Sequence, residues 1–448
     1  MTRVRRYPGS TLVRVLRQSI ILKLLRCASK RRWFFRFIHD KSLEISYLQD
    51  TQYVYPWFLK DIRTNRLISI DALRGIAALS VVFFHVHLFV YPQNIPVTSL
   101  WLKVIQFPLN FGLLGRTGVI LFFVLSGFCI HLRWAKQKAA GEEQPIDFLQ
   151  FWKRRMWRLY PTYSVVLIFS VGLALALGYF HFNEDFFNSL FAHLLMVQNF
   201  QPTWSTDFNP PFWTLAIEEQ LYLIYFILLW LRNKFGWRNA VLSCIGSRLL
   251  WNCAGWMLIP FGYHIFLDDG AFNFWFIWAL GAVAVESWLG LVKLPAWTKE
   301  LKWACLLLNF SMLLEFYKSQ NITDATNIWF YRGFMMILDP LWGVGYFILV
   351  NYFVSLESKW KESGAIAFAV RKLADVGLFS YSLYLTHQIW MEHFPFRALH
   401  LWTGISDSGI RWSVTILLPL ISLYLAWILF QLIERHFMVP YSEWRKSK

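Results

Sequence analysis

The chain has 448 residues, of which 56% are hydrophobic, and it carries a formal net charge of +17. A mean hydropathy of +0.39 is too apolar for a water-soluble domain of this length and indicates an integral membrane protein. The positive charge does not indicate a nucleic-acid-binding protein, because lysines and arginines occur in clusters between apolar stretches. Such clusters are typical of loops retained on the cytoplasmic side of a membrane.

The first 66 residues form a basic extension in which arginine and lysine alternate with leucine, isoleucine and phenylalanine. This pattern favours an amphipathic helix that lies on an anionic cytoplasmic leaflet. A targeting peptide is the alternative, since the first residues are rich in arginine and poor in acidic residues. We see no short apolar core followed by a cleavage site, so we expect the first spanning helix to direct insertion.

Apolar stretches of membrane-spanning length follow the extension. Ten of them lie at 68–90, 114–132, 159–180, 213–231, 239–260, 272–289, 302–317, 333–354, 376–394 and 411–432. A basic cluster follows each even-numbered stretch, whereas the segment 181–212 contains neither lysine nor arginine. The sequence therefore predicts an all-α integral membrane fold, a bundle of about ten transmembrane helices with both termini cytoplasmic.

The chain is accordingly divided into three parts. We expect a basic extension over 1–66, a transmembrane domain over 67–437 and a basic cytoplasmic tail over 438–448. The five cysteines are scattered without a CxxC pair, so we expect neither a zinc site nor a disulfide framework.

The first span carries three ionisable side chains, Asp71, Arg74 and His85. Each charged group in lipid costs about 2.5 kcal/mol or more unless it is paired or lines a cavity. In a helix Arg74 and His85 share one face, separated by roughly 16 Å along the axis, and Asp71 lies one turn before Arg74, where it can pair with it. A buried ion pair with a hydrogen-bonded histidine is the structural alternative. His87 lies on nearly the opposite face from His85, so we expect no metal site.

Two further stretches carry charge into the membrane. Arg155 and Arg158 lie where a cytoplasmic loop enters the third span, and paired guanidinium groups there suit a phosphate-bearing ligand. Arginines at a cytoplasmic helix end are also the ordinary topology signal. Glu218 lies roughly 8 Å into the fourth span, where a carboxylate needs a partner or a water-filled cavity. We expect Glu219 to point outward, toward the interface.

The ninth span brings hydroxyl groups and an imidazole into the bundle. Tyr384 and His387 lie near its middle, behind Ser380, Tyr381 and Ser382. These groups predict a polar lining of a cavity. An interhelical hydrogen-bond network is the structural alternative, and we prefer it for the serines.

These stretches together resemble the acyltransferase 3 family of polytopic membrane acyltransferases, which O-acylate surface glycans and related acceptors. The motifs occur in order: DALRG followed by His85, FFVLSGF at 122–128, Arg155 with Arg158, WTLAIEEQLYL at 213–223, FSYSLYLTH at 379–387 and LIER at 432–435. The resemblance covers residues 68–437. The sequence departs from the family pattern at Thr214, where serine is usual, and at His436, where proline is common.

The resemblance implies a membrane acyltransferase that moves an acyl group, with acetyl expected, from cytoplasmic acyl-CoA to a hydroxyl of a glycan or lipid-linked saccharide outside. His85 would be the general base or the nucleophile that forms an acyl-histidine, and Glu218 would orient it or bind the acceptor. Acyl-CoA would be bound by Arg74, Arg155 and Arg158. The acceptor side or its supporting lining would comprise Asp71, His387 and Tyr384.

We expect acyl-CoA as a substrate, with no tightly bound cofactor, no metal and no nucleic acid partner. The expected location is the cell membrane, crossed several times, and the inner membrane if the source is bacterial. The alternative function is a proton-coupled secondary transporter of an anionic solute, with His85, Glu218 and His387 as a proton relay. We see no inverted repeat of the kind such transporters often contain.

Overall fold

The computed structural model describes residues 66–90, 115–142, 146–258, 270–321, 328–392 and 407–438. Within these ranges the chain forms helices and connecting turns, without a strand, which confirms the predicted all-α class. The described residues from Leu67 onward belong to one compact unit. Apart from Arg66, the predicted N-terminal helix lies outside the described residues, and so does the basic tail beyond Met438.

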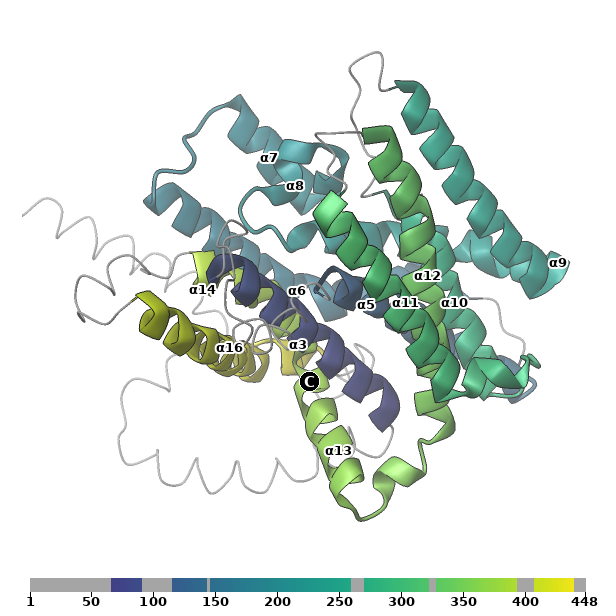
Figure 1. The fold of residues 1–448 in the computed structure, drawn as a ribbon. Coiled ribbons are helices and arrows are strands. Elements are labelled where there is room, and N and C mark those ends of the chain that lie inside the picture. Colours follow the sequence, from purple (N-terminus) through teal and green to yellow (C-terminus); the bar gives the residue numbers. More distant parts are fainter. Residues whose placement is uncertain are drawn as a thin grey trace, which may run out of the picture. The chain divides into compact units, whose positions relative to one another are not determined.

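Each predicted span overlaps a helix of the structure (Figure 1). The long helices are α3 (Ile68–Val90), α5 (Gly115–Ala139), α6 (Phe148–Ala176), α9 (Phe212–Leu258), α10 (Ala271–Trp288), α11 (Leu301–Asn321), α12 (Ile328–Ser355) and α16 (Asp407–Leu432). Between α6 and α9 lie the short helices α7 (Glu184–Leu194) and α8 (Pro202–Thr206). The segment between α12 and α16 contains α13 (Ala365–Leu378) and α14 (Ser380–Glu392), and η7 (Glu434–Phe437) follows α16.

The fourth and fifth predicted spans are two helices, both within α9, that meet at a kink where Gly236 has non-helical backbone angles (φ 77°, ψ 170°). A positive φ of this kind favours glycine. The ninth span corresponds to α14, which has 13 residues and is therefore only about 20 Å long, shorter than the roughly 30 Å hydrocarbon core.

Six of the described helices are long and apolar enough to cross a membrane. They are α3, α5, α6, α9, α12 and α16. The chain is therefore a membrane protein. The count of ten crossings and the cytoplasmic position of both termini remain predictions.

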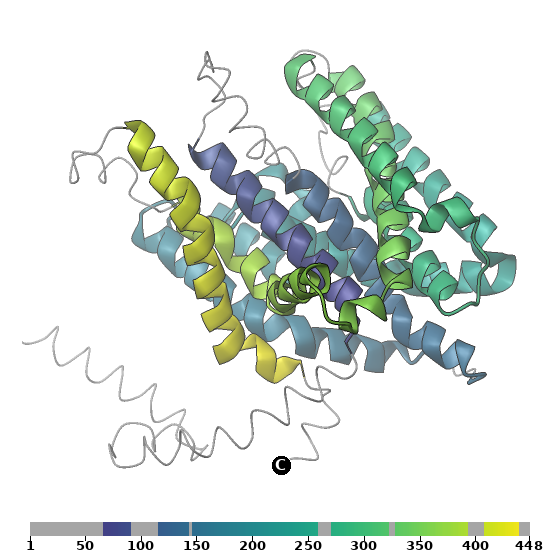
Figure 2. The ribbon, with the colours of Figure 1, turned by 60° about the horizontal axis from the view of Figure 1, so that its bottom comes forward.

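Glycines allow the backbones of neighbouring helices to approach closely. A Cβ atom on Gly281 of α10 would lie 1.9 Å from the carbonyl oxygen of Val124 in α5, and a Cβ atom on Gly377 of α13 would lie 1.8 Å from that of Asp71 in α3. Small residues at helix crossings are the usual basis of packing in membranes. As a result α3 contacts α5, α13, α14 and α16 (Figure 2), and its polar residues meet side chains from distant parts of the sequence.

Candidate functional site

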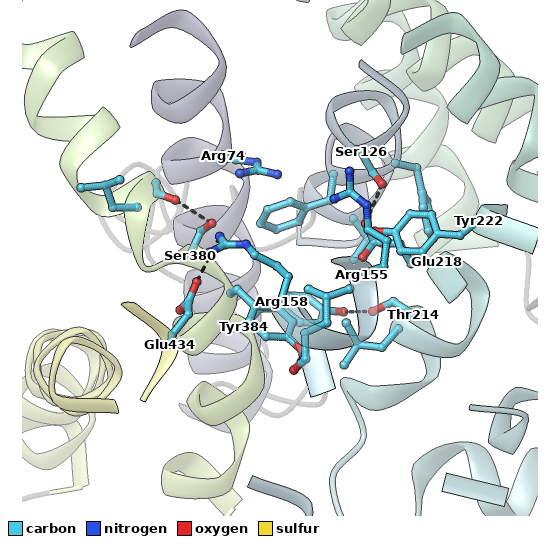
Figure 3. A pocket seen from close by; sticks show the side chains of 18 residues that line it. Arg74, Ser126, Arg155, Arg158, Thr214, Glu218, Tyr222, Ser380, Tyr384 and Glu434 are labelled. Carbon is cyan, nitrogen blue, oxygen red and sulfur yellow. Dashed lines mark hydrogen bonds and ion pairs between the residues drawn. The ribbon is translucent and has the colours of Figure 1, made fainter. Parts of the chain in front are cut away.

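A cavity at the start of α3 gathers three arginines. It is lined by Arg74 of α3, Arg155 and Arg158 of α6, Glu218 of α9 and Glu434 of η7 (Figure 3). Three guanidinium groups against two carboxylates leave an excess of positive charge. The cavity volume is about 110 Å³, below the roughly 300–1,000 Å³ of sites that enclose a whole ligand. We call it the arginine cavity, and it has room for a narrow chain or part of a larger molecule.

The two α6 arginines reach opposite sides of this cavity. Arg158 lies 3.6 Å from the Glu434 carboxylate, whereas Arg155 points to the Glu218 side (Figure 3). Nε of Arg155 and one terminal nitrogen of Arg158 are buried and have no hydrogen-bond partner within the described chain. Buried donors are nearly always satisfied in proteins, so these two nitrogens have hydrogen-bonding capacity that the described protein atoms do not use.

Two hydrogen bonds from Ser382, a residue of the FSYSLYLTH motif, hold Glu434 in place. Its carboxylate accepts hydrogen bonds from the backbone N–H of Ser382 at 3.1 Å and from the Ser382 hydroxyl at 2.6 Å. Its side chain is fully buried. Glu434 belongs to the LIER motif, and the sequence alone predicts no role for it.

Glu218 lies in the arginine cavity and is oriented by two hydroxyl groups. Its Oε1 accepts hydrogen bonds from Ser126 of α5 at 2.5 Å and from Tyr222 at 2.6 Å. The indole N–H of Trp278 in turn donates to the Ser126 hydroxyl at 3.2 Å. Ser126 is the second residue for which the sequence predicted no role. The expectation for Glu219 was wrong, because its side chain is only 4% exposed.

A second cavity surrounds the other predicted catalytic residue. His85 lines it together with Trp213 at the start of α9, Tyr331 of α12 and Tyr384 of α14. Its volume is about 410 Å³, within the range of small-molecule sites. We call it the histidine cavity. Val119 and Tyr384 line both cavities, so these two side chains form a shared wall between them.

His387 contacts His85. Nε2 of His387 lies 3.2 Å from Nδ1 of His85, and the ring centroids are 4.9 Å apart. Glu218 lines the arginine cavity and not the histidine cavity, whereas His387 is in direct contact with the imidazole of His85. Tyr384 lies beside this pair, and its hydroxyl is 2.7 Å from that of Thr214. Thr214 therefore retains the hydroxyl that serine usually supplies in the family.

Asp71 lies in the first turn of α3, where its backbone packs against Gly377, and it lines neither cavity. Within the described residues, no cluster of three or more histidine, cysteine, aspartate or glutamate side chains is arranged to hold a metal ion.

Comparison with known proteins adds a family to this geometry. A protein family described as an acyltransferase domain matches residues 67–433. Acyltransferase MdmB of Streptomyces mycarofaciens is 31% identical over 43% of this chain and 44% of its own length. Peptidoglycan O-acetyltransferase OatA of Listeria monocytogenes is 26% identical over 71% of this chain and 48% of its own length.

The O-acetyltransferase OatA of Staphylococcus aureus is 26% identical over 39% of this chain and 27% of its own length. This chain thus spans about half the length, or less, of these relatives. No solved structure matches it significantly.

Proposed function

We propose, starting from the fact that the chain belongs to the acyltransferase 3 family, that it is a membrane O-acetyltransferase. It would transfer an acetyl group from cytoplasmic acetyl-CoA to a hydroxyl of a saccharide on the opposite side of the membrane. The observation that carries this proposal is the pair of cavities with a shared wall, one rich in arginine and the other containing His85. The relatives named O-acetyltransferases support the choice of acetyl as the acyl group.

The arginine cavity suits the donor. Acetyl-CoA carries its phosphates at one end and its thioester at the other, joined by a narrow extended arm. Buried, unpartnered nitrogens of Arg155 and Arg158 supply donors for phosphate oxygens. The small volume fits the arm, with the nucleotide outside the cavity. The helical rise from Arg74 to His85, roughly 16 Å, is comparable with the length of an extended arm.

The histidine cavity suits the acceptor. The rings of Trp213 and Tyr331 line it and offer flat apolar surfaces to a saccharide ring, while polar groups fix its orientation. His85 would take the proton from the acceptor hydroxyl as the oxygen attacks the thioester carbonyl carbon. The carbon–sulfur bond then breaks, and the proton passes to the departing CoA thiolate. Transfer through an acyl-histidine, with the same net products, is the alternative route.

We propose a donor-side role for Glu218 in place of the two roles that the resemblance implied, which were to orient His85 or to bind the acceptor. Since it lies in the arginine cavity, we assign it to the donor side, where its carboxylate accepts hydrogen bonds and partly balances the arginines. Its two hydroxyl partners hold it in one orientation.

Release of CoA from acetyl-CoA tests this function. Purified protein in lipid vesicles is incubated with acetyl-CoA, with and without soluble peptidoglycan fragments, and free thiol is measured alongside acetyl ester on the fragments. We expect ester formation that requires His85, with His85→Gln as the inactive control. Absence of ester and thiol, together with proton-coupled uptake of an anionic solute into the vesicles, would favour the transporter.

A further inference from the structure

The contacts around His85 determine which of its nitrogens carries the proton. We propose that His387 is a positioning residue that accepts a hydrogen bond from the Nδ1–H group of His85, so that Nε2 of His85 is the basic nitrogen available to the histidine cavity. The catalytic role of this arrangement rests on the proposed function, whereas the protonation pattern of the two rings is independent of it.

The first step concerns His387. Its Nδ1 lies 2.9 Å from the carbonyl oxygen of Tyr384 and 3.2 Å from that of Leu383. A carbonyl oxygen only accepts hydrogen bonds, so Nδ1 of His387 must carry a proton. The neutral ring has one N–H group, and therefore Nε2 of His387 is an acceptor.

The second step concerns His85. Its Nδ1 lies 3.2 Å from Nε2 of His387 and 2.9 Å from the carbonyl oxygen of Val81. Both neighbours are acceptors, so the proton lies on Nδ1 of His85, where the two acceptors share it in a bifurcated hydrogen bond. In the neutral ring Nε2 then holds the free lone pair, and within the described chain no protein group makes a hydrogen bond with that nitrogen.

The arrangement supports a change of charge at His85 during the reaction. When Nε2 takes a proton from the acceptor hydroxyl, the ring becomes an imidazolium and its Nδ1–H bond to His387 becomes charge-assisted and stronger. His387 is fully buried, so water does not compete for its Nε2 atom. A neutral imidazole thus takes the place that a carboxylate occupies in a Ser-His-Asp triad.

Nitrogen NMR tests the protonation pattern without substrate. Protein labelled with ¹⁵N-histidine is measured in lipid bilayers at about pH 8, where an unperturbed imidazole is neutral. The His85 and His387 signals are assigned by their loss in His85→Gln and His387→Gln. We expect both rings to be protonated at Nδ1. A proton on Nε2 of either neutral ring would overturn the inference, whether or not acetyl transfer is the function.

Two substitutions test the positioning role. His387→Leu removes the acceptor and should lower kcat about 10- to 100-fold, the range of a charge-assisted hydrogen bond, with both KM values within roughly twofold. His387→Gln retains an acceptor oxygen and should recover part of the lost kcat. Thr386→Val is the matched control, because Thr386 donates only to the Ser382 carbonyl within α14, and it should keep wild-type kcat.

A kcat of His387→Leu within twofold of wild type would refute the positioning role. Equal loss in both His387 variants, accompanied by equal loss of thermal stability, would assign His387 to folding instead.

Discussion

Arg155 and Arg158 make different contacts, so their alanine variants should lose activity in different ways. The guanidinium of Arg155 lies over the rings of Phe151 and Tyr222, 5.7 and 5.8 Å from their centroids, and its Nε atom has no hydrogen-bond partner within the described residues. Arg158 pairs with the buried Glu434. Arg155→Ala therefore removes only the proposed contact with the donor phosphates, whereas Arg158→Ala also leaves a buried carboxylate without its countercharge.

The expected magnitudes follow from these contacts. A hydrogen bond to a charged group contributes about 1.5–3 kcal/mol, so each variant should raise the KM for acetyl-CoA about 10- to 150-fold. Removing one partner of a fully buried ion pair costs about 3–5 kcal/mol. We expect only about 1–2 kcal/mol for Arg158→Ala, because its side chain is 27% exposed and the N–O distance is 3.6 Å, and exposure weakens the pair.

The assay combines donor saturation curves with thermal unfolding in detergent. The double variant Arg158→Ala with Glu434→Gln separates the two effects, since glutamine keeps an acceptor for Ser382 but removes the unpaired charge. The double variant should recover stability and keep the raised KM, which is the non-additive result expected for residues in contact.

Two outcomes would refute this reasoning. Unchanged donor saturation in both single variants would reduce Arg155 and Arg158 to topology signals. An equal loss of stability in Arg155→Ala and Arg158→Ala would show that the pair with Glu434 does not distinguish them.

Three further predictions concern the base, the packing and the topology. His85→Gln should abolish transfer with thermal stability retained, because glutamine forms hydrogen bonds but takes no proton near neutral pH; near wild-type turnover would contradict the role. Gly281→Ala should lower stability by about 1–3 kcal/mol or more, since its Cβ would meet the Val124 carbonyl; an unchanged unfolding temperature would contradict this packing. In a cysteine-free background, exposed Asn188→Cys should react with an impermeant thiol reagent from outside and exposed Lys136→Cys only after permeabilisation; the reverse would refute the predicted topology.

The helices were predictable because hydropathy reports the length of an apolar stretch. The conformation of the connections was not. The basic residues 232–238 predicted a break between two spans, and the break occurs at Gly236, but the residues on either side of it stay helical and form no extended loop. Basic residues near the membrane surface are compatible with a helix as well as with a loop, so charge alone does not distinguish the two.

The site was predictable where its residues share one helix. Arg74 and His85 were assigned to one face of α3 from their spacing, and the structure places them in two cavities that share a wall. The partners that orient the site come from other helices: Ser126 contacts Glu218, and Glu434 contacts Arg158. Such contacts depend on helix packing, on which the spacing within one segment carries no information.

The separation of the two cavities has an electrostatic consequence. Two unit charges roughly 16 Å apart, the helical rise from Arg74 to His85, interact by only about 1 kcal/mol at an effective dielectric constant of about 20. In the proposed mechanism, Arg74 at the donor end therefore has little influence on the charge of His85. Had the arginines lain one turn from the imidazole, they would have opposed the positive charge that a general base acquires. In the proposed mechanism, the length of α3 allows one bundle to hold an anionic donor at one end and to remove a proton at the other.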